Sequence, residues 1–447
     1  MANTIFAQCS AKGKAGVSVF RISGPNALSA LSKLITHNYN QLKPRMLHLR
    51  KIYTVKTKQL IDEAMVVYFK GKSSFTGEDS VEIYTHGSLS VIKLLNQTLA
   101  SMEDFRLAQP GEFAKRSFLN GKMDLTSAEG LADLIDAETE MQHKQAVAQL
   151  GGALEKVYEH WRQQILKIIS LLEAYIDFPD EDIPESTISE VENKIKSLTK
   201  SIGIHLNDNN RGERLRNGIK LTIIGRPNAG KSSLVNHIMK RDLSIVSDIA
   251  GTTRDIIEGY IDISGYPIIL QDTAGININT NDEIEQKGIK KALNAAGDSD
   301  IKIIIYDGLS NDIDTNFIKK ISDENTIIVR NKIDLLKNNH PAKMLNNMEI
   351  IDISAKKGSG FEQLYKKIVS ICDRIASPSD SPQITRARYR AQLERATENL
   401  SRFSIDNDLV LATEDLRMTA QSISNITGKI TVDEILGEIF SNFCIGK

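Results

Sequence analysis

Between residues 219 and 376, short apolar runs alternate with stretches of helical periodicity. Each apolar run is followed by a polar loop and is too short for a buried helix, which predicts buried strands. The runs occupy residues 221–224, 268–270, 326–330 and 350–353. After the first run, Leu234, Val235 and Ile238 recur at helical spacing. The pattern predicts a compact α/β domain over residues 218–376.

The N-terminal part of the chain has a second mixed pattern. Residues 17–22 alternate like a half-buried strand, and residues 65–69 and 81–84 are further apolar runs. Residues 91–102 carry leucines on one helical face. We expect a small α/β domain over residues 1–118.

The remaining two segments, residues 119–217 and 377–447, have helical periodicity. Because the termini of a domain often lie close together, the economical architecture is one helical domain into which the α/β unit is inserted. Two separate helical domains are the alternative. The polar composition of residues 207–218 predicts a linker. The acidic stretch 177–184 is better explained as a solvated loop than as a cation site.

Composition excludes several classes of protein. The 447 residues carry a net charge of −1, so any contact with RNA needs a local basic patch or a partner. The three cysteines have no close pairing, which argues against a disulfide framework or a zinc site. The N-terminus has no apolar signal core and no stretch is apolar enough to span a bilayer, so we expect no membrane and a cytoplasmic location.

The loop after the first apolar run matches the phosphate-binding pattern, with Gly225, Gly230, Lys231 and Ser232 at the required spacing. Its backbone N–H groups and the following helix N-terminus would hold phosphates. Lys231 would reach the β- and γ-phosphates, and Ser232 would bind Mg²⁺. The expected contacts are Asn228, Ala229, Gly230, Lys231, Ser232 and Ser233. A glycine turn before an ordinary helix is the alternative, and strand, loop, Lys-Ser and helix in this order make it improbable.

Two later loops select the base. Asp334, in Asn331-Lys332-Ile333-Asp334, would accept both the N1–H and the exocyclic N–H of guanine, whereas adenine would present an unprotonated N1. In the loop Ser354-Ala355, a backbone N–H would meet the guanine O6. The sequence therefore predicts a GTPase.

The segment Asp272-Thr273-Ala274-Gly275 completes the nucleotide motifs, with Asp272 near Mg²⁺ and the Gly275 amide on the γ-phosphate. Many small GTPases place a water-orienting glutamine next, but here that position is Ile276. Glu283 and Glu285 follow in the same loop. Arg254 stands in a candidate switch loop, either as a functional group or as a surface charge.

Charged residues in or beside the N-terminal apolar segments carry less information. Arg21, Glu82 and Lys122 are more simply interpreted as solvated strand ends when taken alone. The C-terminal tail is more specific, because residues 443–447 follow the apolar positions Ile435, Ile439 and Phe440. This pattern predicts that the end of the last helix is docked. Cys444 either acts as a nucleophile or packs as a small apolar side chain.

Three stretches resemble a known family: the phosphate loop Gly-Arg-Pro-Asn-Ala-Gly-Lys-Ser-Ser, the segment Asp-Ile-Ala-Gly-Thr-Thr-Arg-Asp at 248–255, and the C-terminal Cys-Ile-Gly-Lys. The chain is similar in them to the bacterial tRNA-modification GTPase family MnmE (TrmE). Residues 16–24, 74–79, 109–113 and 119–125 extend the likeness to essentially the whole chain. The implied fold is an N-terminal folate-binding α/β domain and a helical domain interrupted by a Ras-like P-loop GTPase domain.

The resemblance also implies partners and a reaction. The N-terminal domain would bind a tetrahydrofolate derivative, in its 5,10-methylene or 5-formyl form, and would form a homodimer. The positions that match the folate-binding residues of the family are Arg21, Glu82, Lys122 and Lys447. We therefore expect Arg21, Glu82 and Lys122 to bind folate rather than to be solvated strand ends. A heterotetramer with the FAD- and NADH-dependent protein MnmG (GidA) would add an aminomethyl-type (carboxymethylaminomethyl) group to C5 of the wobble uridine of certain tRNAs.

For GTP hydrolysis, the resemblance implies that K⁺ replaces an arginine finger. The K⁺ positions are Asn228, Ser247, Ile249 and Thr252, and the Mg²⁺ positions are Ser232 and Thr253. Asp248, Ala250 and Gly251 complete the loop around the nucleotide, and Glu285 matches the water-positioning residue.

Two other functions share part of this evidence. A ribosome-assembly GTPase would have every nucleotide motif but would need a basic RNA-binding appendage. A regulatory module, in which GTP only switches partner affinity, would leave tRNA modification unaffected by changes at the folate residues.

Overall fold

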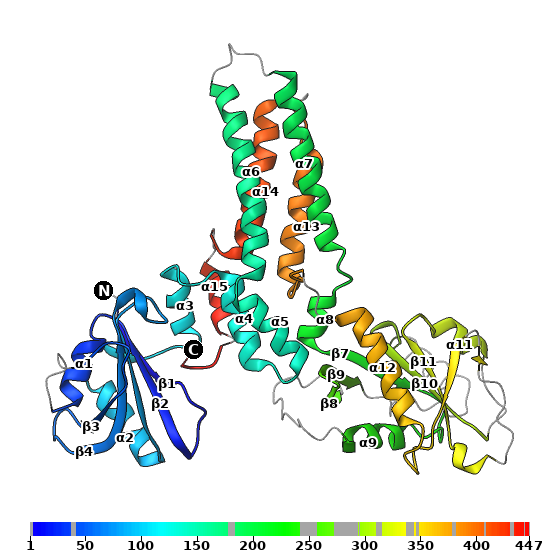
Figure 1. The fold of residues 1–447 in the computed structure, drawn as a ribbon, viewed down its shortest axis with the longest axis horizontal. Coiled ribbons are helices and arrows are strands. Elements are labelled where there is room, and N and C mark those ends of the chain that lie inside the picture. Colours follow the sequence, from blue (N-terminus) through cyan, green and yellow to red (C-terminus); the bar gives the residue numbers. More distant parts are fainter. Residues whose placement is uncertain are drawn as a thin grey trace. The chain divides into compact units, whose positions relative to one another are not determined.

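The computed structural model describes residues 3–36, 42–177, 184–241, 257–271, 294, 296–309, 315–336, 344–345, 348–377, 381–405, 408–429, 433–441 and 443–446. The chain divides into two compact units. Figure 1 labels their helices and strands. The first comprises Met1–Ala132, Leu150–Lys167 and Ala420–Lys447, and the second comprises Asp133–Gln149 and Ile168–Thr419.

The first unit contains a six-stranded sheet in the order β3-β4-β5-β2-β1-β6. Its strands are β1 (Thr4–Gln8), β2 (Ala15–Ser23), β3 (His48–Tyr53), β4 (Leu60–Phe69), β5 (Ser80–Gly87) and β6 (Phe105–Leu107). Among the described strands of this sheet, β1 and β6 pair in parallel and all other neighbours pair antiparallel. Helices α1 (Ala27–Leu34) and α2 (Leu89–Ala100) share a core with one face of the sheet, because alternate strand residues point to the same face.

The C-terminal end of the chain folds into this same unit. Helices α3 (Glu112–Leu119), α4 (Leu125–Asp136) and α15 (Asp433–Ser441) share an apolar cluster that includes Leu125, Phe440 and Phe443.

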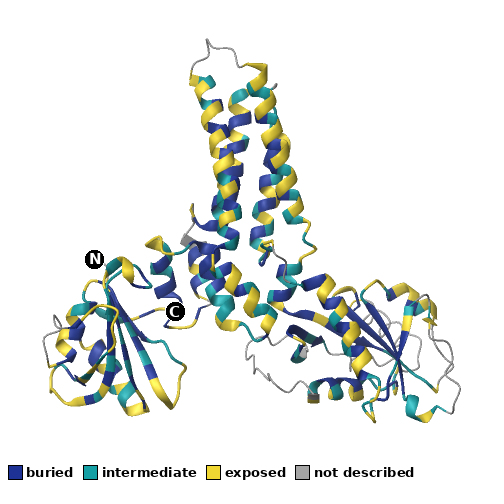
Figure 2. Cartoon of the chain, viewed as in Figure 1, coloured by how far each residue is buried: buried dark blue, intermediate teal, exposed yellow. Residues whose placement is uncertain are grey.

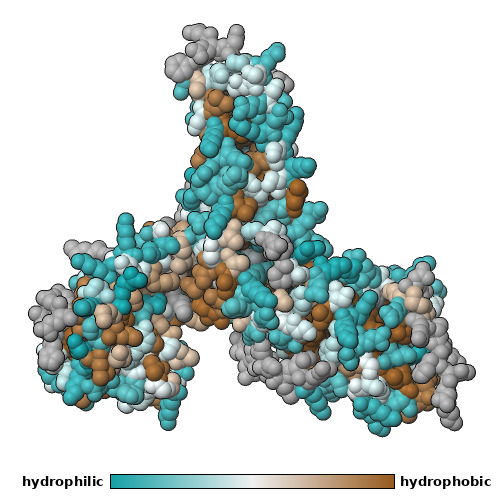
Figure 3. Space-filling view, in the orientation of Figure 1, coloured by the Kyte–Doolittle hydropathy of each residue, from teal (hydrophilic) through white to brown (hydrophobic). Residues whose placement is uncertain are grey.

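Exposed apolar side chains lie on and beside β3, including Leu47 and Leu49. Apolar patches are visible on this part of the molecule in Figure 3.

Helices from both sides of the GTPase segment pack together, so the prediction of one interrupted helical domain is confirmed. In the second unit, α7 (Glu185–Leu206) buries Val191, Ile195 and Ile202 where it contacts α13 (Ala387–Arg402), and the buried positions form stripes in Figure 2. α6 (Ala153–Asp177) and α14 (Leu409–Thr427) are joined by the Arg417–Glu173 ion pair at 2.7 Å.

The second unit also holds a seven-stranded sheet in the order β12-β13-β11-β10-β7-β9-β8. Its strands are β7 (Ile219–Ile224), β8 (Ile257–Ile263), β9 (Tyr266–Gln271), β10 (Ile301–Asp307), β11 (Thr326–Asn331), β12 (Met344–Leu345) and β13 (Met348–Asp352). Helices α9 (Lys231–Arg241) and α12 (Phe361–Ala376) bury one face, and α11 (Thr315–Ile321) buries the other. The predicted fold class, an α/β multidomain protein with a helical domain and a GTPase domain, is confirmed.

The linker expected over residues 207–218 was wrong in part, because α8 (Arg211–Asn217) lies within it. Leu215 is buried in the core of the second sheet. Arg214 binds Asp300 at 2.7 Å and Arg216 binds Asp133 at 2.8 Å. The partners that fix this helix are more than eighty residues away in the chain, so the local pattern could not reveal it. Residues 140–149 of this unit belong to α5 (Glu140–Leu150), and no described helix is long and apolar enough to cross a membrane.

Candidate functional site

The nucleotide motifs meet at one edge of the second sheet. β7, β10, β11 and β13 run parallel, so their carboxyl ends lie at the same edge, where α/β proteins bind ligands. The phosphate loop leaves β7 there, and the segments 331–334 and 354–355 follow β11 and β13.

The backbone of the phosphate loop requires its glycines. A Cβ atom on Gly225 would lie 2.2 Å from the Ile305 carbonyl oxygen. Gly230 has φ +100°, and a Cβ there would lie 2.0 Å from Nδ2 of Asn331. Asn228 has φ +63°, a conformation that asparagine tolerates better than most residues. The loop therefore turns tightly under the first residues of α9, where Ser232 and Ser233 are exposed.

Lys231 lies inside this loop. Its Nζ donates to the carbonyl oxygens of Gly225 at 2.7 Å and Arg226 at 3.1 Å. Burial lowers the pKa of the Lys231 ammonium, since removal from water disfavours its charge. An incoming phosphate would supply the compensating negative charge, which is the chemistry expected of this residue.

Asn331 connects the phosphate loop to the 354–355 loop. Its Nδ2 donates to the Ala229 carbonyl at 2.8 Å, and its Oδ1 accepts from the Ala355 N–H at 3.0 Å. The Ala355 N–H, one of the backbone donors in the loop expected near guanine O6, thus donates to Asn331 in this structure. Lys332 has a left-handed backbone and places its ammonium 2.7 Å from Asp307.

Asp334 is oriented by Ser354, whose hydroxyl donates to Oδ1 at 2.7 Å. The same hydroxyl accepts from the Lys357 N–H at 3.1 Å, which fixes its direction. The bond from Ser354 lowers the pKa of Asp334, so the group stays an ionised acceptor at neutral pH. A carboxylate held by one oxygen leaves the second oxygen for a ligand.

An ion pair that sequence reasoning missed aligns these two loops. The Arg330 guanidinium forms two bonds of 2.7 Å with the Asp352 carboxylate across the β11–β13 pair. The Arg330 side chain is only 2% exposed. The available signal was one charged residue in each of the predicted strand runs, residues 326–330 and 350–353.

Many predicted residues lie outside the described part of the chain. They are Ser247, Asp248, Ile249, Ala250, Gly251, Thr252, Thr253, Arg254, Asp272, Thr273, Ala274, Gly275, Ile276, Glu283, Glu285 and Lys447. Of the proposed K⁺ and Mg²⁺ ligands, Asn228 and Ser232 are described. Within the described ranges, no group of three His, Cys, Asp or Glu side chains is arranged to hold a metal ion.

A second constellation lies on the N-terminal sheet. Arg21 donates to Glu82 at 2.9 Å across the β2–β5 pair, and the Tyr84 hydroxyl donates to the other Glu82 oxygen at 2.6 Å. The guanidinium lies 5.0 Å from the Phe75 ring centre and 5.6 Å from that of Phe113. Arg21 and Glu82 are 17% and 14% exposed, so they are not solvated strand ends. Burial, followed by the bond to Glu82, raises the pKa of Tyr84 to about 12, which keeps it a neutral donor.

Lys122 is oriented differently from the Arg21–Glu82 pair. Its ammonium is exposed and donates to the Lys72 carbonyl at 2.7 Å. The structure therefore gives Arg21 and Glu82 a direct contact, and it gives Lys122 a contact with a neighbouring loop.

The C-terminal tail is docked at the end of β1. Ile445 forms a β-bridge with Pro110, and the Gly111 N–H donates to the Cys444 carbonyl at 3.4 Å. Gly446 has φ +103°, and a Cβ there would lie 2.5 Å from the Gln8 carbonyl oxygen. The Cys9 thiol, which sequence reasoning did not assign, donates to the Gly446 carbonyl at 3.1 Å. Cys444 itself is exposed, so it is accessible for chemistry and contributes little packing.

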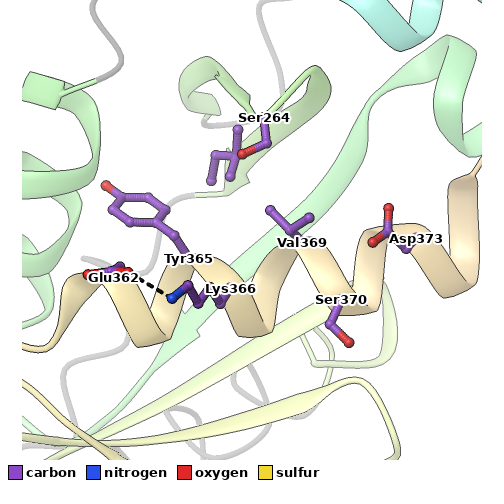
Figure 4. Close-up of a pocket in the computed structure, with 8 residues that line it drawn as sticks. Ser264, Glu362, Tyr365, Lys366, Val369, Ser370 and Asp373 are labelled. Carbon is purple, nitrogen blue, oxygen red and sulfur yellow. Dashed lines mark hydrogen bonds and ion pairs between the residues drawn. The ribbon is translucent and has the colours of Figure 1, made fainter.

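A separate hollow of about 370 Å³ lies between the β8–β9 turn and α12 (Figure 4). Tyr365 and Val369 line it together with Ser264, and the exposed Lys366–Glu362 pair spans 2.7 Å at its side. None of its lining residues belongs to the nucleotide motifs, so we assign it no part in GTP binding.

Similarity to known proteins extends over 99% of the chain. A family model described as "MnmE helical domain" matches residues 125–444, and one described as "GTP-binding protein TrmE N-terminus" matches residues 4–122. The "tRNA modification GTPase MnmE" of Rickettsia akari is 55% identical and that of Rickettsia bellii is 56% identical, each over 99% of this chain and 100% of the relative. A solved G domain of the T. maritima FeoB iron transporter is 25% identical over 34% of this chain and 98% of its own length, with a TM-score of 0.27.

Proposed function

This chain belongs to the MnmE family of tRNA modification GTPases, and from this premise we propose that it adds an aminomethyl-type group to C5 of the wobble uridine. The reaction would use a tetrahydrofolate one-carbon unit and a heterotetramer with the FAD- and NADH-dependent protein MnmG. GTP hydrolysis would control the state of this complex. We place the reaction in the cytoplasm, on a homodimer joined through the N-terminal domain.

The observation that carries the proposal is the combination of two sites in one chain. One is the edge where the phosphate loop, Asn331 and Asp334 are held by direct hydrogen bonds. The other is the Arg21–Glu82 pair, whose guanidinium lies over two aromatic rings, in the same compact unit as the docked tail. A ribosome-assembly GTPase has no need for the second.

The residues at the N-terminal sheet fit a folate. Its flat, polar pterin ring needs aromatic surface and in-plane donors and acceptors, which Phe75, Arg21 and Glu82 offer. When bound, a folate would supply the one-carbon unit. Lys122 and Lys447 are proposed to complete the site through their charges.

In the GTPase site, Lys231 would stabilise charge on the β- and γ-phosphates, and Ser232 with Thr253 would hold Mg²⁺ near Asp272. Asp334 would select guanine, and Glu285 would orient the attacking water. Because Ile276 cannot orient water and no arginine finger is identified, Asn228, Ser247, Ile249 and Thr252 are proposed to hold K⁺. K⁺ would add positive charge where the transition state develops negative charge.

We expect K⁺ to raise GTP turnover well above Na⁺, because the smaller ion fits the same oxygen cage poorly. The substitution Asn228→Gly tests the K⁺ ligand alone, because glycine adopts φ +63° without strain and the change removes only the side-chain amide. It should bind GTP but lose the K⁺ stimulation. Phosphate release in matched KCl and NaCl measures this, and equal wild-type rates in the two salts would rule out the K⁺ role.

A reconstituted reaction tests the proposed function. The purified chain, MnmG, an unmodified tRNA transcript, GTP, NADH, a methylene-folate as the carbon source and ammonium or glycine as the amine source should yield a C5-substituted wobble uridine by mass spectrometry. Omission of the chain or of the folate should each abolish the product. Product formed without the folate would contradict the proposed carbon source, and no difference on omission of the chain would contradict the function itself.

A further inference from the structure

The charges of the chain are strongly segregated. Ten of its 56 Lys and Arg residues lie in residues 1–61, whereas none of its 57 Asp and Glu residues does, and the first acidic residue is Asp62. The basic residues are Lys12, Lys14, Arg21, Lys33, Lys43, Arg45, Arg50, Lys51, Lys56 and Lys58. A near-neutral chain thus carries a basic N-terminal segment, which is the electrostatic signature of a polyanion site.

The sheet topology brings two parts of this segment to one end. Ala15 of β2 pairs with Gly87 of β5, and Ile52 of β3 pairs with Asp62 of β4. The Asp62 carboxylate accepts from the backbone N–H of His86 at 2.7 Å. These contacts place the start of β2, the end of β3, the start of β4 and the end of β5 at the same end of the sheet. The β1–β2 turn and the β3–β4 turn therefore leave the sheet at the same end, three strand spacings or about 14 Å apart.

These two turns carry four exposed lysines, Lys12, Lys14, Lys56 and Lys58, which we call the lysine rim. Hydrogen bonds hold both turns in shape: Gln8 Nε2 donates to the Ala11 carbonyl at 3.0 Å, and the Gln59 N–H donates to the Thr54 hydroxyl at 2.9 Å. The Lys58 ammonium lies 3.4 Å from the Lys33 carbonyl, which adds the end of α1 to the same surface.

Acidic groups do not neutralise the rim. Asp62 is 11% exposed and is bound to His86 at 2.9 Å, and Glu63 lies opposite Lys51 in the register. Within the described ranges, none of the four rim lysines is in an ion pair. Other exposed lysines, such as Lys194 and Lys366, each pair with a glutamate one turn away.

The rim also adjoins the docked tail. Cys9 bonds Gly446 and is only three residues from Lys12. A polyanion on the rim would therefore have a nucleotide within reach of Cys444. We propose that the lysine rim binds the phosphate backbone of the tRNA substrate and holds the wobble nucleotide at the tail. The inference rests on the proposed function and adds the surface that delivers its substrate.

Fluorescence anisotropy with a labelled, unmodified tRNA transcript tests the proposal, in about 50 to 300 mM KCl. The rim variant combines Lys12→Gln, Lys14→Gln, Lys56→Gln and Lys58→Gln in the full-length protein. The control combines Lys144→Gln, Lys194→Gln, Lys196→Gln and Lys366→Gln, which removes four exposed lysines that are paired with glutamates.

Because each lysine–phosphate contact adds about 0.7 to 0.9 to the slope of log affinity against log salt, the loss of four lysines should reduce the slope by about three units. Its affinity in low salt should fall at least about tenfold, with GTP hydrolysis and melting temperature unchanged. The control should bind like the wild type. Equal loss in both variants, or no loss in the rim variant, would overturn the rim as the tRNA surface.

The test of the lysine rim and the test of the proposed function can fail independently. A rim variant that binds and modifies tRNA normally would refute the rim and leave the modification activity standing. A wild-type chain that binds no tRNA at low salt would also refute the rim, while the reconstituted reaction would still decide the function.

Discussion

A chain that ends at Phe443 is expected to lose wobble-uridine modification while it keeps K⁺-stimulated GTP hydrolysis. Phe443 is buried and its ring lies 5.6 Å from that of Phe440, so the core of the last helix survives the truncation. The residues removed contact Pro110, Gly111 and Cys9 through their backbone, at the end of the N-terminal sheet. The phosphate-loop chemistry uses none of them.

Phosphate release by the purified truncation and nucleoside analysis of tRNA from complemented cells measure the two activities. Cys444→Ala separates chemistry from docking, because this exposed side chain contributes little packing. If Cys444 is a nucleophile, the point variant should be as inactive in modification as the truncation. Normal modification by the truncated chain would show that the tail is only a structural end.

Asp334→Asn should weaken GTP binding by about 10²–10³-fold, because the amide nitrogen would oppose the donors of guanine. Ser354 holds one carboxylate oxygen at 2.7 Å, and an asparagine oxygen can accept the same bond. The substitution therefore changes the ligand side of the residue with little change in the loop. Xanthosine triphosphate, which presents a carbonyl in place of the exocyclic amine, should gain affinity. A variant that binds GTP like the wild type would contradict the assignment.

Glu285→Ala provides the contrasting variant. Orienting a water molecule matters mainly in the transition state, so this change should lower turnover and leave GTP affinity nearly intact. Titration with a fluorescent GTP analogue and single-turnover hydrolysis distinguish the two variants. If Glu285→Ala hydrolyses GTP at the normal rate, Glu283 or another group positions the water.

Local patterns predicted what depends on local structure. The strand, glycine loop and helix around Lys231 were identifiable because the pattern lies within one short segment and includes a glycine at a positive φ angle. The helical periodicity within residues 119–217 predicted packed helices, and α7 buries its apolar positions where it contacts α13.

Contacts between distant segments could not be predicted in the same way. Arg330 and Asp352 pair because β11 and β13 are neighbours in the sheet, and Arg21 lies between Phe75 and Phe113 because three separate segments converge on it. Cys9 was left unassigned, since only the docked tail gives it a role. The lysine rim likewise depends on the order of strands, which places two distant turns at one end of the sheet.

The most direct test of the central claim is mass spectrometry of wobble nucleosides from cells that lack this protein. We predict that C5-substituted wobble uridines disappear, with unsubstituted C5 positions in their place, and that the wild-type gene restores them. A gene encoding Asp334→Asn should fail to restore them. Unchanged wobble uridines, together with a defect in ribosomal subunits, would contradict the account and favour a ribosome-assembly GTPase.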